Sequence, residues 1–103
     1  MRVRREGQSY AHPFVVLIAL PNELEQIRIG VSAGRAVGGA VERNRAKRLL
    51  RAGIAPLLPK ISTGYDLVLL ARKPILNTKS QQVTAALAKN LKKADLIKDD
   101  HPS

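Results

Sequence analysis

The sequence predicts an α+β fold, a two-layer split βαβ-type sandwich in which helices cover a small sheet. Three apolar runs have the length of β-strands, two segments carry apolar residues at helical spacing, and the predicted order is strand, strand, helix, strand, helix. With 103 residues, the chain suffices for one small domain, which we assign to 1–103. We expect 1–11 and 96–103 to be poorly ordered, apart from a short edge strand near 8–10.

Two strands are predicted in the first third of the chain. The segment 13–20 is a continuous apolar run, and Pro13 stands at its first position, where a sheet tolerates proline. The segment 26–33 alternates apolar with polar or small residues, which is typical of a half-buried strand. Because a turn at Pro21 and Asn22 separates them, we interpret the two runs as an antiparallel hairpin with a loop of about five residues.

A glycine-rich segment at 34–39 then interrupts the strand pattern. A phosphate-binding loop would end in Gly-Lys-Ser/Thr, whereas Gly39 is followed by alanine and valine. We therefore interpret the segment as a flexible connection between a strand and a helix. A functional alternative is that its glycines let a nucleic-acid backbone approach the start of the helix. It leads into a helix predicted from about residue 40 to 58, where two prolines stop it.

The last part of the chain predicts one more strand and one more helix. The run 65–71 is a buried-strand candidate that follows a turn at 62–64. The final helix runs to about Asp95, with Thr78 or Ser80 as its N-cap. Its apolar residues recur at helical spacing: Val83, Leu87, Leu91 and Ala94.

The helix predicted at 40–58 has one strongly basic face. At about 100° per residue, five of its polar or basic side chains fall within an arc of roughly 140°, with Arg45 just beyond it. Like charges four residues apart destabilise an isolated helix by a few tenths of a kcal/mol each, so a polyanion would supply the missing counter-charge. The five residues are Arg43, Asn44, Lys47, Arg48 and Arg51.

Overall charge points to the same class of partner. The chain has 18 Lys and Arg against 8 Asp and Glu, a formal net charge of +10, which makes nucleic acid the first candidate partner and an anionic membrane the second. A membrane-surface helix would carry Trp or Phe, yet aromatic residues make up 3% of the chain. Few aromatics also disfavour base stacking as the main mode, so phosphate and shape recognition of structured RNA fits best. A DNA-binding module stays open as an alternative that competition between A-form and B-form duplexes would separate.

Candidates for catalysis within the chain are weak. The absence of cysteine excludes disulfides, thiolate zinc sites and a cysteine nucleophile. His12 lacks an obvious carboxylate partner, and the acids show no spacing of a metal site or an acid–base dyad. No apolar run could span a bilayer and no signal-peptide pattern follows Met1, so we expect a soluble cytoplasmic protein.

The basic helix and its flanks carry a specific resemblance. Residues 43–51 resemble the RNR signature of the bacterial ribonuclease P protein subunit. Residues 28–32 followed by 38–41 resemble that family's strand, loop and start of the helix, 65–72 resemble a later strand, and 14–16 resemble an earlier one. The likeness extends over nearly the whole chain.

The resemblance implies the element order αβββαβα of a ribosomal protein S5 domain 2-like fold. It also implies a left-handed strand–helix–strand crossover through the basic helix, against the general right-handed preference. The family's opening helix would precede residues 3–7, so we expect this first helix to be missing or shortened here.

The resemblance further implies a role in tRNA 5′-end maturation. The protein would bind the catalytic RNA of ribonuclease P and the 5′ leader of precursor tRNA, the latter in a cleft between the sheet and the first helix. The RNA subunit, with Mg²⁺, would perform phosphodiester hydrolysis, and the protein alone would be inactive. No DNA or membrane partner is implied.

The same resemblance assigns site residues. Phe14 and Arg28 belong to the candidate leader cleft, and Ala36 stands where the family has the second of two basic residues. No catalytic and no metal-binding residue is implied. The alternative is a non-catalytic, ribosomal-type protein that binds structured RNA without assisting tRNA maturation. The implied RNA-binding residues are Arg35, Arg43, Asn44, Arg45, Lys47, Arg48 and Arg51.

Overall fold

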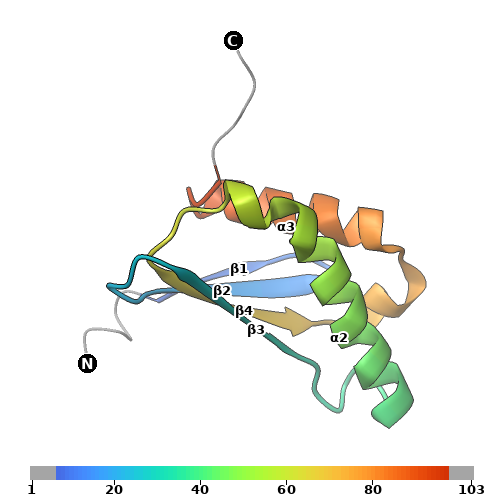
Figure 1. Cartoon of the computed structure of the whole chain (residues 1–103). Helices are drawn as coiled ribbons and strands as arrows, with labels where there is room; N and C mark the ends of the chain where they lie inside the picture. Colours follow the sequence, from blue (N-terminus) through green and yellow to red (C-terminus); the bar gives the residue numbers. More distant parts are fainter. Residues whose placement is uncertain (1–6, 98–103) are drawn as a thin grey trace.

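The computed structural model describes residues 7–97 as one sheet with two helices packed on it (Figure 1). The expected loss or shortening of the first helix, and the expected disorder of 1–6 and 98–103, lie outside the described residues. The strands are β1 (Gln8–Ala11), β2 (Val15–Pro21), β3 (Ile27–Ser32) and β4 (Tyr65–Ala71). The helices are α2 (Ala40–Ile54) and α3 (Ser80–Lys93), with 3₁₀ turns η1 (Ala55–Lys60) and η2 (Lys73–Asn77).

The sheet corrects the predicted hairpin. Its strand order is β1-β2-β4-β3, so β4 lies between β2 and β3, antiparallel to the first and parallel to the second. The reason is burial: β4 is an almost continuous apolar run that suits a central position, whereas the alternating β3 suits an edge. Proximity in sequence favoured the hairpin, but the apolar content of the strands decides the pairing.

The chain joins β3 to its parallel neighbour β4 through α2. In the view of Figure 1, it runs along β3 at the front, returns above the sheet through α2, and enters β4 behind β3. This path is a left-handed crossover, as the family resemblance implied and against the usual preference. The crossover places α2 beside the β3 edge of the sheet.

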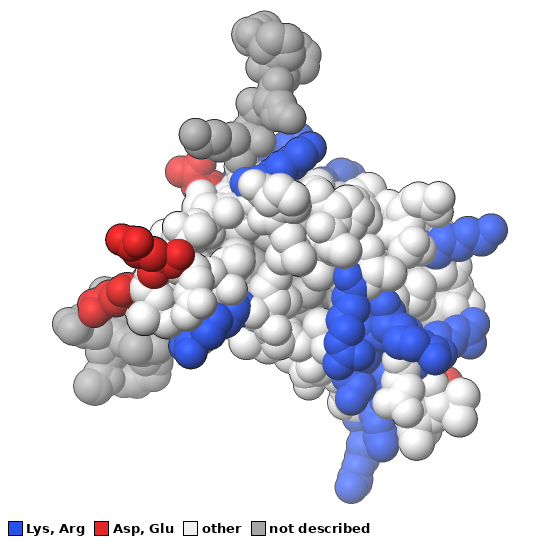
Figure 2. All heavy atoms as spheres, in the orientation of Figure 1, with Lys and Arg blue, Asp and Glu red and all other residues white. Residues whose placement is uncertain are grey.

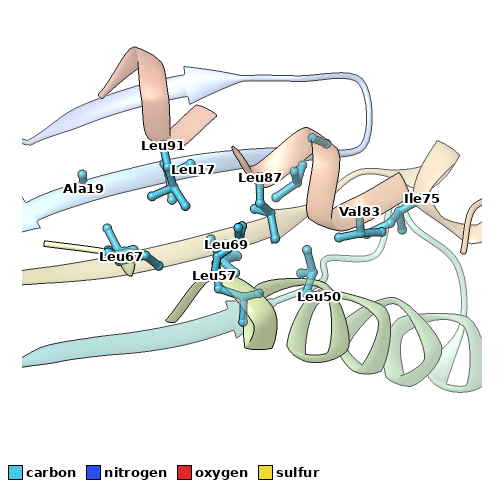
Figure 3. Packing of buried hydrophobic residues seen from close by; sticks show 14 of the residues in the cluster. Leu17, Ala19, Leu50, Leu57, Leu67, Leu69, Ile75, Val83, Leu87 and Leu91 are labelled. Atoms are coloured by element: carbon cyan, nitrogen blue, oxygen red, sulfur yellow. The ribbon is translucent and has the colours of Figure 1, made fainter. Parts of the chain in front are cut away.

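The core lies between the sheet and the two helices. Alternate residues of β2 and β4 point toward the helices and are buried, which fits the two-residue period of a strand. Figure 3 shows leucines of both strands meeting leucines of α2 and α3. Residues at the centre of this core include Leu17, Leu50, Leu67, Leu69, Leu87 and Leu91.

The basic helix ends earlier than predicted. It stops at Ile54 rather than near Leu58, and the chain continues as the 3₁₀ turn η1. Pro56 near the start of that turn has no N–H to give to the helix and its ring crowds the preceding turn, so the α-helical ladder ends one turn sooner. Burial of Leu57 holds η1 against the core.

The start of α3 also differs from the prediction. Lys79, not Thr78 or Ser80, occupies the N-cap, and its backbone N–H donates to Gln82 Oε1 at 2.9 Å. The Thr78 hydroxyl instead donates to the carbonyl of Ile75 at 2.7 Å. The Thr78 side chain, which the sequence pattern had assigned to the N-cap of α3, therefore caps the end of η2 instead.

The described parts of both chain ends are ordered, and the predicted short edge strand near 8–10 is confirmed. Residues 8–11 form the edge strand β1 along β2. At the other end, Leu96 and Ile97 are buried, and Ile97 forms a β-bridge with Ile61. The expectation of disorder for 96–97 was wrong because these two apolar side chains complete the core under η1.

Candidate nucleic-acid interface

Helix α2 presents the predicted basic residues on its outer side. Its opposite side is buried through Ala46, Leu50, Gly53 and Ile54, which fixes the rotation of the helix about its axis. Figure 2 shows Lys and Arg side chains gathered over α2, whereas acidic side chains lie mainly at the far end of the molecule. We call the outward-facing set, Arg43, Asn44, Arg45, Lys47, Arg48 and Arg51, the α2 basic face.

The charges of the α2 basic face are not balanced within the described residues. Glu42 is the single acid in the helix, and its carboxylate is engaged at the helix start, where it accepts the Gly39 N–H at 3.0 Å. No cation of α2 forms an ion pair with another residue in the range 7–97. Arg45, Arg48 and Arg51 are exposed, so the face offers free cations to a polyanion.

The loop before α2 is held in place rather than freely flexible. The Val37 side chain is buried and its N–H donates to the Gly34 carbonyl at 3.0 Å. Gly38 has φ of +146°, and a Cβ there would lie 2.8 Å from Glu42 Cβ, so this position requires glycine. Arg43 reaches back to the Gly38 carbonyl at 3.4 Å. The exposed Arg35 is therefore carried on an ordered turn next to the helix start.

The face of the sheet that points away from α2 and α3 carries no helix in the described part of the chain (Figure 1). By strand alternation, the residues of β2 and β4 that point away from the core meet there, and all of them are half-buried. We call this surface the helix-free face. Its apolar residues are Val16, Ile18, Leu20, Val68 and Leu70.

The two residues predicted for the leader cleft do not come together. The Phe14 carbonyl accepts the Arg72 N–H beyond one end of β4, whereas Arg28 lies opposite Asp66 near its other end. The step from Asp66 to Arg72 is six residues along the chain, or about 20 Å at roughly 3.3 Å per residue. The Phe14 ring lies against His12, with centroids 5.0 Å apart.

Arg28 is engaged in a bidentate ion pair. Its Nε and Nη2 donate to the two oxygens of Asp66, each at 2.8 Å, and Asn22 Nδ2 donates to Asp66 Oδ1 at 2.8 Å. The Arg28 and Asn22 hydrogen bonds lower the pKa of Asp66, and Asp66 raises the pKa of Arg28. Asp66 thus balances the charge of Arg28. The sequence analysis missed this ion pair because the predicted hairpin placed Arg28 beside β2 instead of β4.

A hollow at the carboxyl ends of β3 and β4 adds two cations that the sequence analysis did not assign. Its volume is about 520 Å³, and Arg72 and Lys73 lie among Ser32, Leu70 and other lining residues. The sequence could have indicated this site, because two basic residues come directly after a buried strand. No group of three or more possible metal ligands occurs within 7–97, and no helix in that range is long and apolar enough to cross a membrane.

Comparisons with known proteins agree on one family. The sequence model of the family described as Ribonuclease P matches residues 1–95. The ribonuclease P protein component of Pelotomaculum thermopropionicum is 40% identical over 95 residues, which cover 92% of this chain and 85% of that protein. The structure of the Staphylococcus aureus RNase P protein aligns with a TM-score of 0.77 at 28% identity, covering 94% of this chain and 89% of that one.

Another relative shares a shorter region. The ribonuclease P protein component of Chloroflexus aurantiacus is 42% identical over 73 residues, which are 71% of this chain but 54% of that protein. The chain therefore matches little more than half of the length of that relative.

Proposed function

This chain belongs to the ribonuclease P protein family, and from that premise we propose that it is the protein subunit of the ribonuclease P ribonucleoprotein. It would bind the catalytic RNA and precursor tRNA and so assist removal of the 5′ leader. The observation that supports this proposal most directly is the α2 basic face, whose exposed cations have no partner among the described residues. The activity would take place in the cytoplasm, where bacterial tRNA precursors are processed.

The protein's part in this activity would be binding and positioning. The α2 basic face would lie along phosphates of folded RNA, and each contact would release a condensed counterion. Rigid packing of α2 on the core would keep its cations in a fixed pattern that suits one backbone geometry. Hydrolysis itself would belong to the RNA subunit and its Mg²⁺ ions, since the site residues proposed here are cations and an amide that suit phosphate binding.

For the 5′ leader, we propose the end of the sheet that holds Phe14. Arg28 is the less suitable of the two predicted cleft residues because Asp66 already balances its charge. At the Phe14 end, Arg72 and Lys73 supply cations next to the apolar Leu70 of the helix-free face. A leader strand there would place phosphates on the cations and sugars or bases on the apolar surface.

The test is precursor-tRNA cleavage at low Mg²⁺ by the bacterial catalytic RNA, with and without this chain. Stimulation by the chain, with no cleavage by the chain alone, is the expected result. If the chain binds the catalytic RNA but leaves cleavage unchanged, the ribosomal-type alternative gains support and the proposal fails.

A second experiment tests the leader assignment. The double variant Arg72→Ala and Lys73→Ala should weaken binding of precursor tRNA to the assembled holoenzyme and leave binding of leaderless tRNA unchanged. The matched control is Lys92→Ala with Lys93→Ala, which removes the same charge from exposed positions on α3. Equal losses for both substrates would contradict the assignment.

A further inference from the structure

A second hollow lies on the other side of α2, at the open edge of the sheet. Its volume is about 590 Å³, within the usual range of small-ligand sites. Half-buried apolar side chains of β3 line it, together with Ile54 of α2 and Leu58 of η1. We call it the edge groove, lined by Ile27, Ile29, Gly30, Val31, Arg51, Ile54 and Leu58.

The edge groove is continuous with the α2 basic face. Arg51 belongs to both, and it is the single charged residue in the lining. Figure 2 shows uncharged surface directly beside the basic side chains over α2. A polyanion on this face would therefore pass a groove whose lining is apolar apart from Arg51, which suits the neutral part of a nucleotide rather than its phosphate.

The backbone of β3 adds polar groups to this apolar groove. β3 is an edge strand, so its side away from β4 has no partner strand among the described residues. Alternate N–H and C=O groups on that side are free to form hydrogen bonds. An apolar groove beside an unpaired strand edge matches the two surfaces of a nucleobase, which has an apolar ring face and a hydrogen-bonding rim.

We propose that the edge groove binds one unpaired nucleobase of the RNA whose phosphates lie on the α2 basic face. This inference rests on the proposed RNA-binding function and adds a preference for RNA with an unpaired base next to the contacted backbone. A single aliphatic groove of this kind agrees with the low aromatic content of the chain, because it needs no stacking platform. Arg51 would bind the phosphate on the 5′ or 3′ side of the inserted base.

The chain offers a direct probe because it contains no tryptophan. Leu58→Trp would place a unique indole at the edge groove, and Leu24→Trp would place one on the β2–β3 loop. The two leucines are matched, since each is 40% exposed. Both variants would be titrated with a single-stranded oligouridylate and with an RNA duplex of the same length, following indole fluorescence and binding anisotropy.

With the single strand, Leu58→Trp should lose most of its indole emission, whereas the emission of Leu24→Trp should change little. With the duplex, both variants should bind without quenching of the indole. RNA binding without this difference would overturn the edge-groove inference and leave the proposed function standing. Absence of binding to both RNAs would overturn the edge-groove inference, and the cleavage test described above would then decide the proposed function separately. Quenching that depends on protein concentration without RNA would assign the groove to a second copy of the chain instead.

Two further measurements avoid any effect of the new indole on folding. In the unsubstituted chain, the methyl resonances of Ile27, Ile29 and Ile54 should shift on adding the single strand, while the buried Ile75 serves as the internal reference. Leu58→Ala should weaken single-strand binding about three- to tenfold, with Leu24→Ala as control. Shifts confined to residues outside the groove would contradict the inference.

Discussion

Removing three neighbouring cations from α2 should change both the strength and the salt dependence of RNA binding. The variant combines Lys47→Ala, Arg48→Ala and Arg51→Ala. Arg43 is left intact because its guanidinium donates to the Gly38 carbonyl and helps hold the loop. Alanine favours helix and relieves like-charge repulsion, so α2 should stay folded in the variant.

The expected magnitude follows from counterion release. Each phosphate contact contributes about 0.7–0.9 to the slope of log affinity against log salt, so three lost contacts should flatten the slope by about 2–3. Between about 50 and about 200 mM salt, the affinity deficit of the variant should then shrink by about 15- to 60-fold. Fluorescence anisotropy with a labelled fragment of the catalytic RNA would measure the slope.

The control removes the same charge elsewhere. Lys89→Ala, Lys92→Ala and Lys93→Ala lower the net charge equally, and all three side chains are exposed on α3. This control should change the slope by less than about 1, because long-range attraction is screened beyond about 10 Å at moderate salt. Equal slope changes in the two variants would refute the assignment of the contacts to α2 and leave net charge as the cause.

Three other changes test the fold and its titration. Gly53→Ala should lower the free energy of unfolding, measured in urea, by about 1–2 kcal/mol. A Cβ there would lie 2.5 Å from Val83 Cγ1, and the cost of this overpacking exceeds the gain of about 1 kcal/mol in helix propensity. Asn90→Leu should raise the melting temperature, since Asn90 Nδ2 is buried without a hydrogen-bond partner among the described residues; a fall would mean that the amide is satisfied. Burial, then Lys89 and Lys93, lower the pKa of His12, so the folded protein binds fewer protons than the unfolded chain and should lose stability as the pH falls below the ordinary value of 6.5. His12→Gln should remove that loss in urea titrations at several pH values.

Local sequence patterns sufficed for the elements whose signals are strong and continuous. The strand at 65–71 has the predicted bounds because its apolar run lies between a glycine turn and two cations. The helix beginning at Ala40 faces the core with the predicted apolar side, since its pattern has the helical period over several turns. The residues that form the α2 basic face could therefore be predicted from the sequence, whereas the position of this face in the fold could not.

Relations between distant segments were harder to predict. The pairing of β3 with β4 depends on how well a whole sheet is buried, and no local pattern contains that information. The ion pair of Arg28 with Asp66 and the hollow beside Arg72 both depend on this pairing, so they were missed with it. Terminal contacts were missed for a related reason, because burial of Leu96 and Ile97 depends on the position of η1.

The balance of energies explains how one helix can carry so concentrated a charge. Like-charge neighbours such as Arg43 and Lys47, or Lys47 and Arg51, each destabilise α2 by a few tenths of a kcal/mol. Burying Leu50 and Ile54 on the other side contributes about 1.5–3 kcal/mol each. Tertiary packing therefore outweighs the repulsion, and the helix that carries the cations is fixed on the core before any RNA binds. A helix fixed in this way loses little backbone freedom on binding, so more of the electrostatic attraction remains as affinity for a backbone of matching shape.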